Sequence, residues 1–304
     1  MRSSRSSTRL AAPDAPSRAR RLGRRLVTIF LVLLALYAAA VAFMAALQTK
    51  MLFPGSGGGH ALPATAERLS LRTPDGVTLQ GVHLPPSHAA KAAPVVLGFG
   101  GNAWDAGEMA LFLHDLYPAA DVVTFHYRGY GPSGGKPGAA ALASDSLLVY
   151  DLAAKRFAGR PIVVAGFSIG SGIAAFLAAR RPVAGTILVT PFDSLTSVVA
   201  DDYRWLPVRL LFRHRLEPAR ELAGTRIPVA IIAAGADRLV PQPRTEALRA
   251  AVPNLVFDRT VAHADHNSIY ANPDFPAAMR EALAAVTAAD PPRPHPLESS
   301  LGKF

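Results

Sequence analysis

A run of uncharged residues near the amino end constrains this chain more than any other feature. It extends from Leu26 to Leu47 with the sequence LVTIFLVLLALYAAAVAFMAAL. At 1.5 Å per residue, a helix of this length covers roughly 33 Å, enough to cross a hydrocarbon core about 30 Å thick. We therefore expect a transmembrane helix over residues 26–47.

Two other structures compete for the same run. A buried core helix of this length almost always has a polar stripe, and none is present here. A cleaved secretory signal is supported by small residues such as Ala40–Val41–Ala42, but its apolar region normally has only about 7–15 residues. The length therefore favours an uncleaved membrane anchor.

The distribution of charge indicates a membrane protein rather than a nucleic-acid-binding one. The formal net charge is +10, but the first 25 residues contain eight arginines against one acid, Asp14, and so account for +7 of it. The rest of the chain carries +3, so no nucleic-acid partner is expected. Arginines before the apolar run, against the lone Lys50 after it, predict a cytoplasmic amino terminus and a domain on the outer, periplasmic or extracytoplasmic, side.

Composition divides the rest of the chain into four parts. Residues 1–25 are rich in Ser, Arg, Ala and Pro and are expected to be disordered, and residues 48–66 to form a linker after the anchor. Residues 67–289 are expected to form one domain, followed by a loose Pro-rich tail at 290–304. The chain has no cysteine, which excludes disulfide scaffolds, zinc–thiolate sites, iron–sulfur clusters and thiol nucleophiles.

Within the domain, short apolar runs alternate with helical patterns. Glu67–Arg72 and Val77–Leu84 flank the turn sequence Thr-Pro-Asp-Gly and predict an antiparallel hairpin. Further strands are expected at Pro94–Gly98, Asp121–His126, Ile162–Phe167, Gly185–Thr190, Pro228–Ala234 and Asn254–Thr260. Four of these are almost continuously apolar, which is typical of parallel strands covered on both faces. The pattern predicts a mostly parallel, doubly wound α/β sheet opened by a hairpin, with a short helical lid over residues 192–225.

The strongest sign of chemistry is a serine between a predicted strand and a predicted helix. Gly166–Phe167–Ser168–Ile169–Gly170 follows the apolar run from Ile162 and precedes an Ala-rich segment. A nucleophile on so tight a turn needs small residues two places to either side. The start of the helix then directs backbone N–H groups, including that of Ile169, at the oxyanion of an acyl-transfer transition state. Ser168 is therefore the predicted nucleophile, against the alternative of a serine that only caps a helix.

A serine nucleophile requires a base and an acid, in the chain order Ser, Asp, His for this arrangement. Asp237 follows a predicted strand in a glycine-containing loop and is the preferred acid, with Asp193 as the alternative. After the last strand, His266 is the preferred base over its neighbour His263. A metal site at His263-x-Asp265-His266 is not favoured, because the further histidine expected at position 261 is Val.

The loop from Gly98 to Ala103 has two interpretations. As G-x-G-x-x-A it resembles a dinucleotide-binding loop, but the next strand ends in His126–Tyr127–Arg128 without the acid that would hold a ribose. Alternatively, the loop supplies the second oxyanion donor, the N–H of Asn102. We favour the second interpretation, which requires neither cofactor nor metal.

These motifs together resemble the α/β-hydrolase superfamily. The similarity rests on Gly-x-Ser168-x-Gly, Gly-Ala-Asp237-x-x-Val-Pro, Asp-His266-Asn and Tyr-Arg-Gly-Tyr-Gly-x-Ser at 127–133. More narrowly, the chain is similar to the membrane-anchored α/β-hydrolase-domain branch, grouped with serine aminopeptidase-like hydrolases. That branch usually has His-Gly-Asn at the first oxyanion loop, where this chain has Gly100–Gly101–Asn102. The resemblance implies serine hydrolysis of acyl esters, lysophospholipids or acyl thioesters.

The predicted function is hydrolysis of a small acyl ester or lipid by a protein anchored in a lipid bilayer. In this scheme Ser168 attacks, His266 transfers the proton and Asp237 orients the imidazole, while Ile169 and Asn102 hold the oxyanion. An aminopeptidase-like hydrolase and a catalytically inactive membrane-tethered binding module are the alternatives. Within the lid, residues 203–215 interleave apolar residues with Arg, and either line an acyl pocket near anionic head groups or form a packed helix with a solvated basic face.

Overall fold

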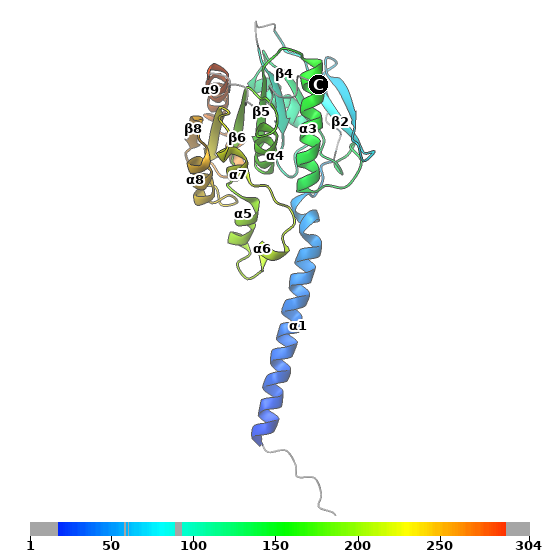
Figure 1. The fold of residues 1–304 in the computed structure, drawn as a ribbon, viewed down its shortest axis with the longest axis vertical. Helices are drawn as coiled ribbons and strands as arrows, with labels where there is room; N and C mark the ends of the chain where they lie inside the picture. Colours follow the sequence, from blue (N-terminus) through cyan, green and yellow to red (C-terminus); the bar gives the residue numbers. More distant parts are fainter. Residues whose placement is uncertain (1–17, 58, 60, 89–92, 290–304) are drawn as a thin grey trace, which may run out of the picture. The chain divides into compact units, whose positions relative to one another are not determined.

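The computed structural model describes residues 18–57, 59, 61–88 and 93–289 (Figure 1). The expected tail at 290–304 and the first 17 residues of the expected basic segment lie outside the described residues. The chain divides after Ala46 into a helical unit and a compact domain that begins at Leu47.

Helix α1, Arg18–Leu52, has 35 residues; the helical unit contains it up to Ala46, and its last residues belong to the domain. Among the described residues it is the one helix long and apolar enough to cross a membrane. Residues 18–25 were expected to be disordered and residues 48–52 to belong to a linker, and both predictions were wrong, because these residues are helical. Arg, Leu and Ala are strong helix formers and extend the helix beyond the uncharged run. Pro54 then disfavours a helical conformation at Phe53 and ends the helix.

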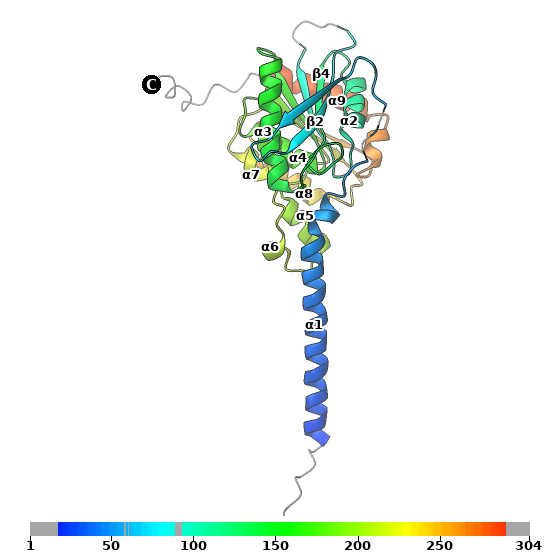
Figure 2. The same ribbon diagram turned by 90° about the vertical axis from the view of Figure 1, so that its right-hand side faces the viewer.

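The domain contains one eight-stranded sheet with the order β1-β2-β4-β3-β5-β6-β7-β8 (Figures 1 and 2). Its strands are β1 Glu67–Arg72, β2 Thr78–Leu84, β3 Val95–Phe99, β4 Asp121–Phe125, β5 Ile162–Phe167, β6 Gly185–Val189, β7 Val229–Ala234 and β8 Leu255–Val261. The first two strands form the predicted antiparallel hairpin, and β4, β3 and β5 to β8 are parallel. The predicted α/β fold class is therefore confirmed.

Helices cover both faces of this sheet, which explains the continuously apolar strands. They are α2 Ala106–Leu116, α3 Ala139–Arg156, α4 Ile169–Ala178, α7 Pro218–Ala223, α8 Gln242–Ala251 and α9 Phe275–Ala288, with a short 3₁₀ turn, η1, at Ser268–Ala271. Helices α2 and α9 bury their apolar residues against one face, while α3, α4, α7 and α8 contribute to the core on the other. Strand β5 lies near the middle and places its carboxyl end between the two layers.

The segment predicted as a lid contains three short helices. Besides α7, these are α5 Leu195–Asp202 and α6 Val208–Leu211. In both views α6 lies outermost of the three (Figures 1 and 2). The lid is joined to the core by buried apolar side chains, among them Phe192, Phe212 and Leu216.

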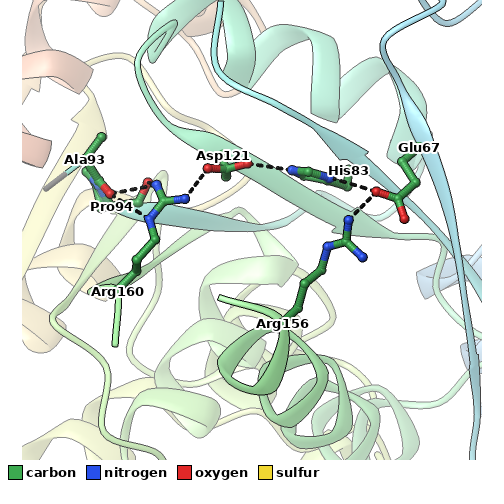
Figure 3. A network of polar contacts seen from close by, with 7 residues as sticks. All are labelled: Glu67, His83, Ala93, Pro94, Asp121, Arg156 and Arg160. Atoms are coloured by element: carbon green, nitrogen blue, oxygen red, sulfur yellow. Dashed lines mark hydrogen bonds and ion pairs between the residues drawn. The ribbon is translucent and has the colours of Figure 1, made fainter. Parts of the chain in front are cut away.

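At the hairpin edge, a polar network connects strands β1, β2 and β4 to the end of α3 (Figure 3). His83 contacts Asp121 at 2.6 Å and Glu67 at 3.3 Å. Arg156 pairs with Glu67, and Arg160 pairs with Asp121 while donating to the carbonyl of Ala93 at 2.8 Å. The network therefore ties segments that are far apart in the sequence to one edge of the sheet.

Candidate active site

The turn after strand β5 holds Ser168 in a strained backbone conformation. The strand ends at Phe167 and helix α4 begins at Ile169, so a single residue makes the turn. Ser168 has φ 51° and ψ −119°, a region that a residue with a Cβ rarely occupies. Its N–H donates to the carbonyl of Val189 at 2.9 Å, and its carbonyl accepts the N–H of Ser171 at 2.9 Å. The neighbouring backbone thus holds the serine at the carboxyl edge of the sheet.

The two glycines of the motif are required by close backbone contacts. A Cβ on Gly166 would lie 2.5 Å from the carbonyl oxygen of Gly170. A Cβ on Gly170 would lie 2.1 Å from the carbonyl oxygen of Phe99, at the end of strand β3. Any side chain at these positions would force the helix away from the sheet. The glycine spacing therefore follows from how tightly strand, turn and helix pack.

His266 lies between Ser168 and Asp237. Its Nε2 is 2.8 Å from Ser168 Oγ, and its Nδ1 is 2.7 Å from Asp237 Oδ2. The histidine comes from the loop after β8 and the aspartate from the loop after β7, so three neighbouring loops at one sheet edge converge. The imidazole is only 6% exposed, which limits the water that can compete for its hydrogen bonds.

Asp237 is oriented by the backbone of its own loop. Its Oδ1 accepts the amides of Leu239 at 2.9 Å and Val240 at 2.8 Å. Because one carboxylate oxygen is used in this way, the other is left to face the histidine. The Asp237 side chain is 4% exposed, so both oxygens are satisfied by protein groups rather than by bulk water.

The alternative acid and base lie elsewhere. Asp193 pairs with Arg244 at 3.1 Å, and burial raises the pKa of its carboxyl group although the nearby guanidinium opposes the shift. His263 is exposed, with φ 58° in the loop. Asp265 accepts the amides of Asn267 and Ser268, which lower its pKa. Of the sequence candidates for acid and base, the structure brings Asp237 and His266 to the serine.

The two predicted oxyanion donors belong to two segments that border the serine. Ile169 is the first residue of helix α4, so its amide has no acceptor within the helix. Asn102 is in the loop after β3, where a Cβ on Gly101 would be 3.8 Å from the Cβ of Ser168. The backbone of this loop therefore runs directly beside the serine, and its amides are available to an oxygen bound there.

Two tyrosines hold this loop in place, a role that the sequence did not predict. Tyr127 donates its hydroxyl to the carbonyl of Gly100 at 2.8 Å, and Tyr130 donates to the carbonyl of Asn102 at 2.5 Å. Burial raises the pKa of both hydroxyls, which remain hydrogen-bond donors. The Tyr-Arg-Gly-Tyr motif contributed to the family resemblance, but nothing in its spacing indicates which carbonyls the two rings would reach.

The arginine of the same motif fixes the tyrosine turn. Arg128 makes two parallel hydrogen bonds to Asp145 on helix α3, at 2.7 and 2.6 Å, and a third to Asp75 at 2.8 Å. The Arg128 guanidinium lowers the pKa of Asp75 to about 2. A bidentate pair of this kind restricts geometry as well as adding attraction. It therefore helps to place both tyrosines beneath the loop.

A group of aromatic rings lies next to the serine. Trp104, from the same loop, packs at 5.2 Å between centroids on Phe167, the residue before Ser168, and at 5.1 Å on Tyr270. Phe112 and Phe275 extend the group toward helices α2 and α9. Burial raises the pKa of Tyr270 to about 12. Phe167 and Phe275 are fully buried, whereas Trp104, Phe112 and Tyr270 are half-buried, so the group joins the loop after β3 to the core.

Comparisons with known proteins match this geometry. A sequence model described as serine aminopeptidase, S33, matches residues 90–221. An uncharacterised protein of Mycobacterium tuberculosis is 34% identical over 221 residues, which cover 69% of this chain and 77% of that protein. The lysophosphatidylserine lipase ABHD12 of Danio rerio is 33% identical over 127 residues, 38% of this chain and 33% of that protein.

The fold is also similar to solved structures. An esterase of Pyrococcus furiosus, Pf2001, superimposes with a TM-score of 0.60, covering 77% of this chain and 97% of that chain. The two sequences are 18% identical, so this likeness concerns the fold alone.

Proposed function

Because the chain belongs to the α/β-hydrolase superfamily, in its serine aminopeptidase-like α/β-hydrolase-domain branch, we propose that it hydrolyses acyl esters through a covalent acyl-enzyme. The chain is a serine hydrolase-like enzyme, and the proposal concerns its substrate and the roles of its residues. One observation supports it above all others. His266 bridges Ser168 and Asp237 with distances of 2.8 and 2.7 Å, beside a strained turn.

In the first half of the reaction, Ser168 Oγ attacks the carbonyl carbon of the ester. His266 Nε2 takes the hydroxyl proton, while its Nδ1–H donates to Asp237 and keeps the ring in the required tautomer. The carbonyl π electrons move to oxygen, and the resulting oxyanion is held by the amides of Ile169 and Asn102. The tetrahedral intermediate collapses when His266 returns the proton to the leaving alcohol, which leaves an ester on Ser168.

In the second half, a water molecule replaces the alcohol. His266 Nε2 accepts a proton from the water as its oxygen attacks the acyl carbon, and the same two amides hold the second oxyanion. Collapse breaks the bond to Ser168 Oγ, which takes the proton back from the imidazolium. The products are a carboxylic acid and the free enzyme, so no cofactor takes part.

We propose lipid esters with a single acyl chain as the substrates. A relative is named as a lysophosphatidylserine lipase, and the half-buried rings of Trp104 and Tyr270, packed together near the turn of Ser168, support an apolar substrate. Helix α1 is long and apolar enough to span a bilayer, so the enzyme would meet its substrate at a membrane.

We further propose that residues 26–47 remain uncleaved within the bilayer, with the amino terminus cytoplasmic and the domain on the outer side. The arginines that precede the run support this orientation. Alkaline phosphatase fused to the carboxyl terminus should be active in a bacterial host, because it folds only outside the cytoplasm. An inactive but expressed fusion would overturn the orientation.

Covalent labelling tests the nucleophile. A fluorophosphonate probe should label the full-length protein in detergent, and Ser168→Ala should abolish labelling. Ser146→Ala is a matched control, because Ser146 is also buried but donates to a carbonyl within helix α3. Labelling that persists in the Ser168→Ala protein would refute the assignment.

A substrate panel tests the reaction class. Acyl esters and lysophospholipids of increasing chain length should be hydrolysed, and a long chain should be preferred to acetate. Faster turnover of aminoacyl amides would instead indicate an aminopeptidase. Absence of both turnover and labelling, in a protein that is folded by circular dichroism, would indicate an inactive binding module.

A further inference from the structure

One stretch of the lid exposes large apolar side chains. We call residues 203–215 the cap tip. Among the described residues from Leu47 onwards, five large apolar side chains are exposed: Met51, Trp205, Leu210, Leu211 and Leu239. Three of them lie on the cap tip, where Leu210 is 81% exposed and Trp205 is 52% exposed. Such a concentration on one short segment is unusual for a surface that faces water alone.

Arginines are interleaved with these apolar residues. The cap tip contains Arg204, Arg209, Arg213 and Arg215 within thirteen positions. In the part of the chain that the structure describes, Arg209 and Arg215 form no ion pair with a carboxylate, unlike Arg244 or Arg181 elsewhere on the domain. Their charges are therefore available to an external anion.

The same two arginines line a cavity next to the cap tip. It has a volume of about 610 Å³ and is bounded by helices α3, α4, α5 and α7. Arg220 adds a third guanidinium to the lining, and Arg180 is already paired with Glu221 at 2.6 Å. The lining contains four arginines against two glutamates, so the cavity favours an anion. None of Ser168, Asp237 and His266 lines it.

The cap tip is fixed to the chain at the end of the uncharged run. Gln48 accepts the amide of Arg213 at 2.8 Å and donates to the carbonyl of Leu211 at 3.3 Å. Thr49 contacts the imidazole of His214 at 2.8 Å, and the Phe53 ring meets the same imidazole edge-on at 5.3 Å. Gln48 directly follows the last residue of the run, so these bonds tie the cap tip to the chain segment next to the predicted transmembrane segment.

We propose that the cap tip is a docking surface for the anionic phospholipids of the membrane that helix α1 enters. Trp205 and Leu210 enter the boundary between head groups and acyl chains, and Arg209, Arg215 and Arg220 bind head-group phosphates. Arginine suits this role because its planar guanidinium forms paired hydrogen bonds to phosphate oxygens. Exposed apolar residues together with basic residues are the combination that membrane-surface segments use. Docking does not depend on hydrolysis, so it goes beyond the proposed function.

The two tryptophans of the chain allow a direct test. Full-length protein with Trp104→Phe retains Trp205 as the sole tryptophan, and Trp205→Phe is the matched control that retains Trp104. Both are reconstituted in nanodiscs of phosphatidylcholine, with or without phosphatidylglycerol, in which part of the lipid carries brominated acyl chains. Bromine quenches only nearby tryptophans. We expect quenching of Trp205 to be at least about twofold stronger than quenching of Trp104, and only when phosphatidylglycerol is present. Each arginine near an anionic membrane surface should strengthen binding to that surface roughly fivefold.

Removing the cationic charges tests their role. In the Trp205-only protein, Arg209→Gln/Arg215→Gln/Arg220→Gln should reduce quenching to the level in pure phosphatidylcholine. The control Lys155→Gln/Arg226→Gln/Arg280→Gln removes the same charge from exposed positions outside the cap tip and should leave quenching unchanged. Ser168→Ala should dock normally, which separates this proposal from the proposed function.

Three outcomes would overturn the proposal. The first is quenching of Trp205 no stronger than that of Trp104. The second is equal quenching with and without phosphatidylglycerol, which would leave no role for the arginines. The third is that brominated lipid does not quench Trp205 and that two copies of the protein cross-link through residues 203–215. This result would assign the surface to a second copy of the protein.

Discussion

The domain contains two histidine–carboxylate pairs that look alike at first sight. His266 lies 2.7 Å from Asp237, and His83 lies 2.6 Å from Asp121. Both histidines are 6% exposed, so burial does not distinguish them. The difference lies at the other ring nitrogen, which faces a hydroxyl in one pair and a second carboxylate in the other.

This difference determines what each ring can do. The Nε2 of His266 faces Ser168 Oγ and can accept its proton, because Nδ1 already donates to Asp237. Both nitrogens of His83 face carboxylate oxygens, so neither faces a hydroxyl group that could act as a nucleophile. A buried histidine beside an acid is therefore not in itself a catalytic feature; the third partner decides.

The groups that surround the two histidine–carboxylate pairs also differ. Arg156 and Arg160 neutralise the acids around His83, and Phe157 packs edge-on against its ring at 5.2 Å (Figure 3). Asp237, by contrast, is held by two backbone amides and has no arginine partner among the described residues. The network at His83 thus resembles a structural clamp, whereas the pair at His266 is open to a reacting group.

The largest effect expected from this comparison is on turnover. His266→Ala should reduce kcat for a good ester substrate by a factor on the order of 10⁶, because the serine loses its base. His83→Ala, the matched substitution, should change kcat by less than about threefold in folded protein. Steady-state kinetics on both variants, with correction for the folded fraction, measures this. Comparable losses of kcat in the two variants would contradict the distinction between the two histidines.

A smaller loss is expected when the acid is changed without changing its shape. Asp237→Asn should lower kcat by about 10⁴-fold, because the amide favours the wrong imidazole tautomer. Asp121→Asn keeps the shape at the other pair and should leave kcat nearly unchanged. Similar kinetics for Asp237→Asn and the unmodified protein would show that this carboxylate does not orient the base.

For stability we expect the opposite order, with a larger decrease in Tm for His83→Ala than for His266→Ala. His83→Ala removes two hydrogen bonds to charged groups and the packing on Phe157, for a loss of about 3 kcal/mol. In a domain of this size that corresponds to a decrease in Tm of roughly 6–12 °C. His266→Ala should lower Tm by less, because Asp237 keeps both amide donors. Differential scanning calorimetry of both proteins provides the measurement, and a larger decrease for His266→Ala would contradict the assignment.

The smallest effect is expected at the loop after β3, which borders Ser168 and has no counterpart at the His83 pair. Tyr130→Phe removes the hydrogen bond to the carbonyl of Asn102 and should lower kcat about 5–10-fold with little change in KM. Tyr150→Phe is a matched control, since its hydroxyl donates to the carbonyl of Pro182 away from the serine. A change confined to KM would indicate that the loop binds substrate rather than the transition state.

The sequence was sufficient to predict the fold and to select the residues that meet at Ser168. Every strand was located to within about one residue, the central ones by continuous apolar runs and the first two by the hairpin turn between them. Candidates at the strand ends could then be ranked by chain order. This worked because the carboxyl ends of parallel strands share one edge, so residues such as Ser168, Asp237 and His266 need no special register to meet.

Contacts between distant side chains could not be obtained in this way. Tyr127 and Tyr130 reach the carbonyls of the β3 loop, and His83 reaches Asp121 from an adjacent antiparallel strand, only through the exact packing of the domain. The helical conformation of residues 18–25 and 48–52 was also missed. The uncharged run marks the part suited to lipid, whereas the helix continues as far as backbone propensity allows.

The backbone at Ser168 has a consequence for how this protein could change over time. A residue with a Cβ at φ 51° is held there against its own preference, so the fold would relax if glycine took its place. If Ser168 is the nucleophile proposed above, a lineage that no longer needed hydrolysis would gain stability by replacing the serine with glycine. Activity and stability would then be in direct conflict at this one position.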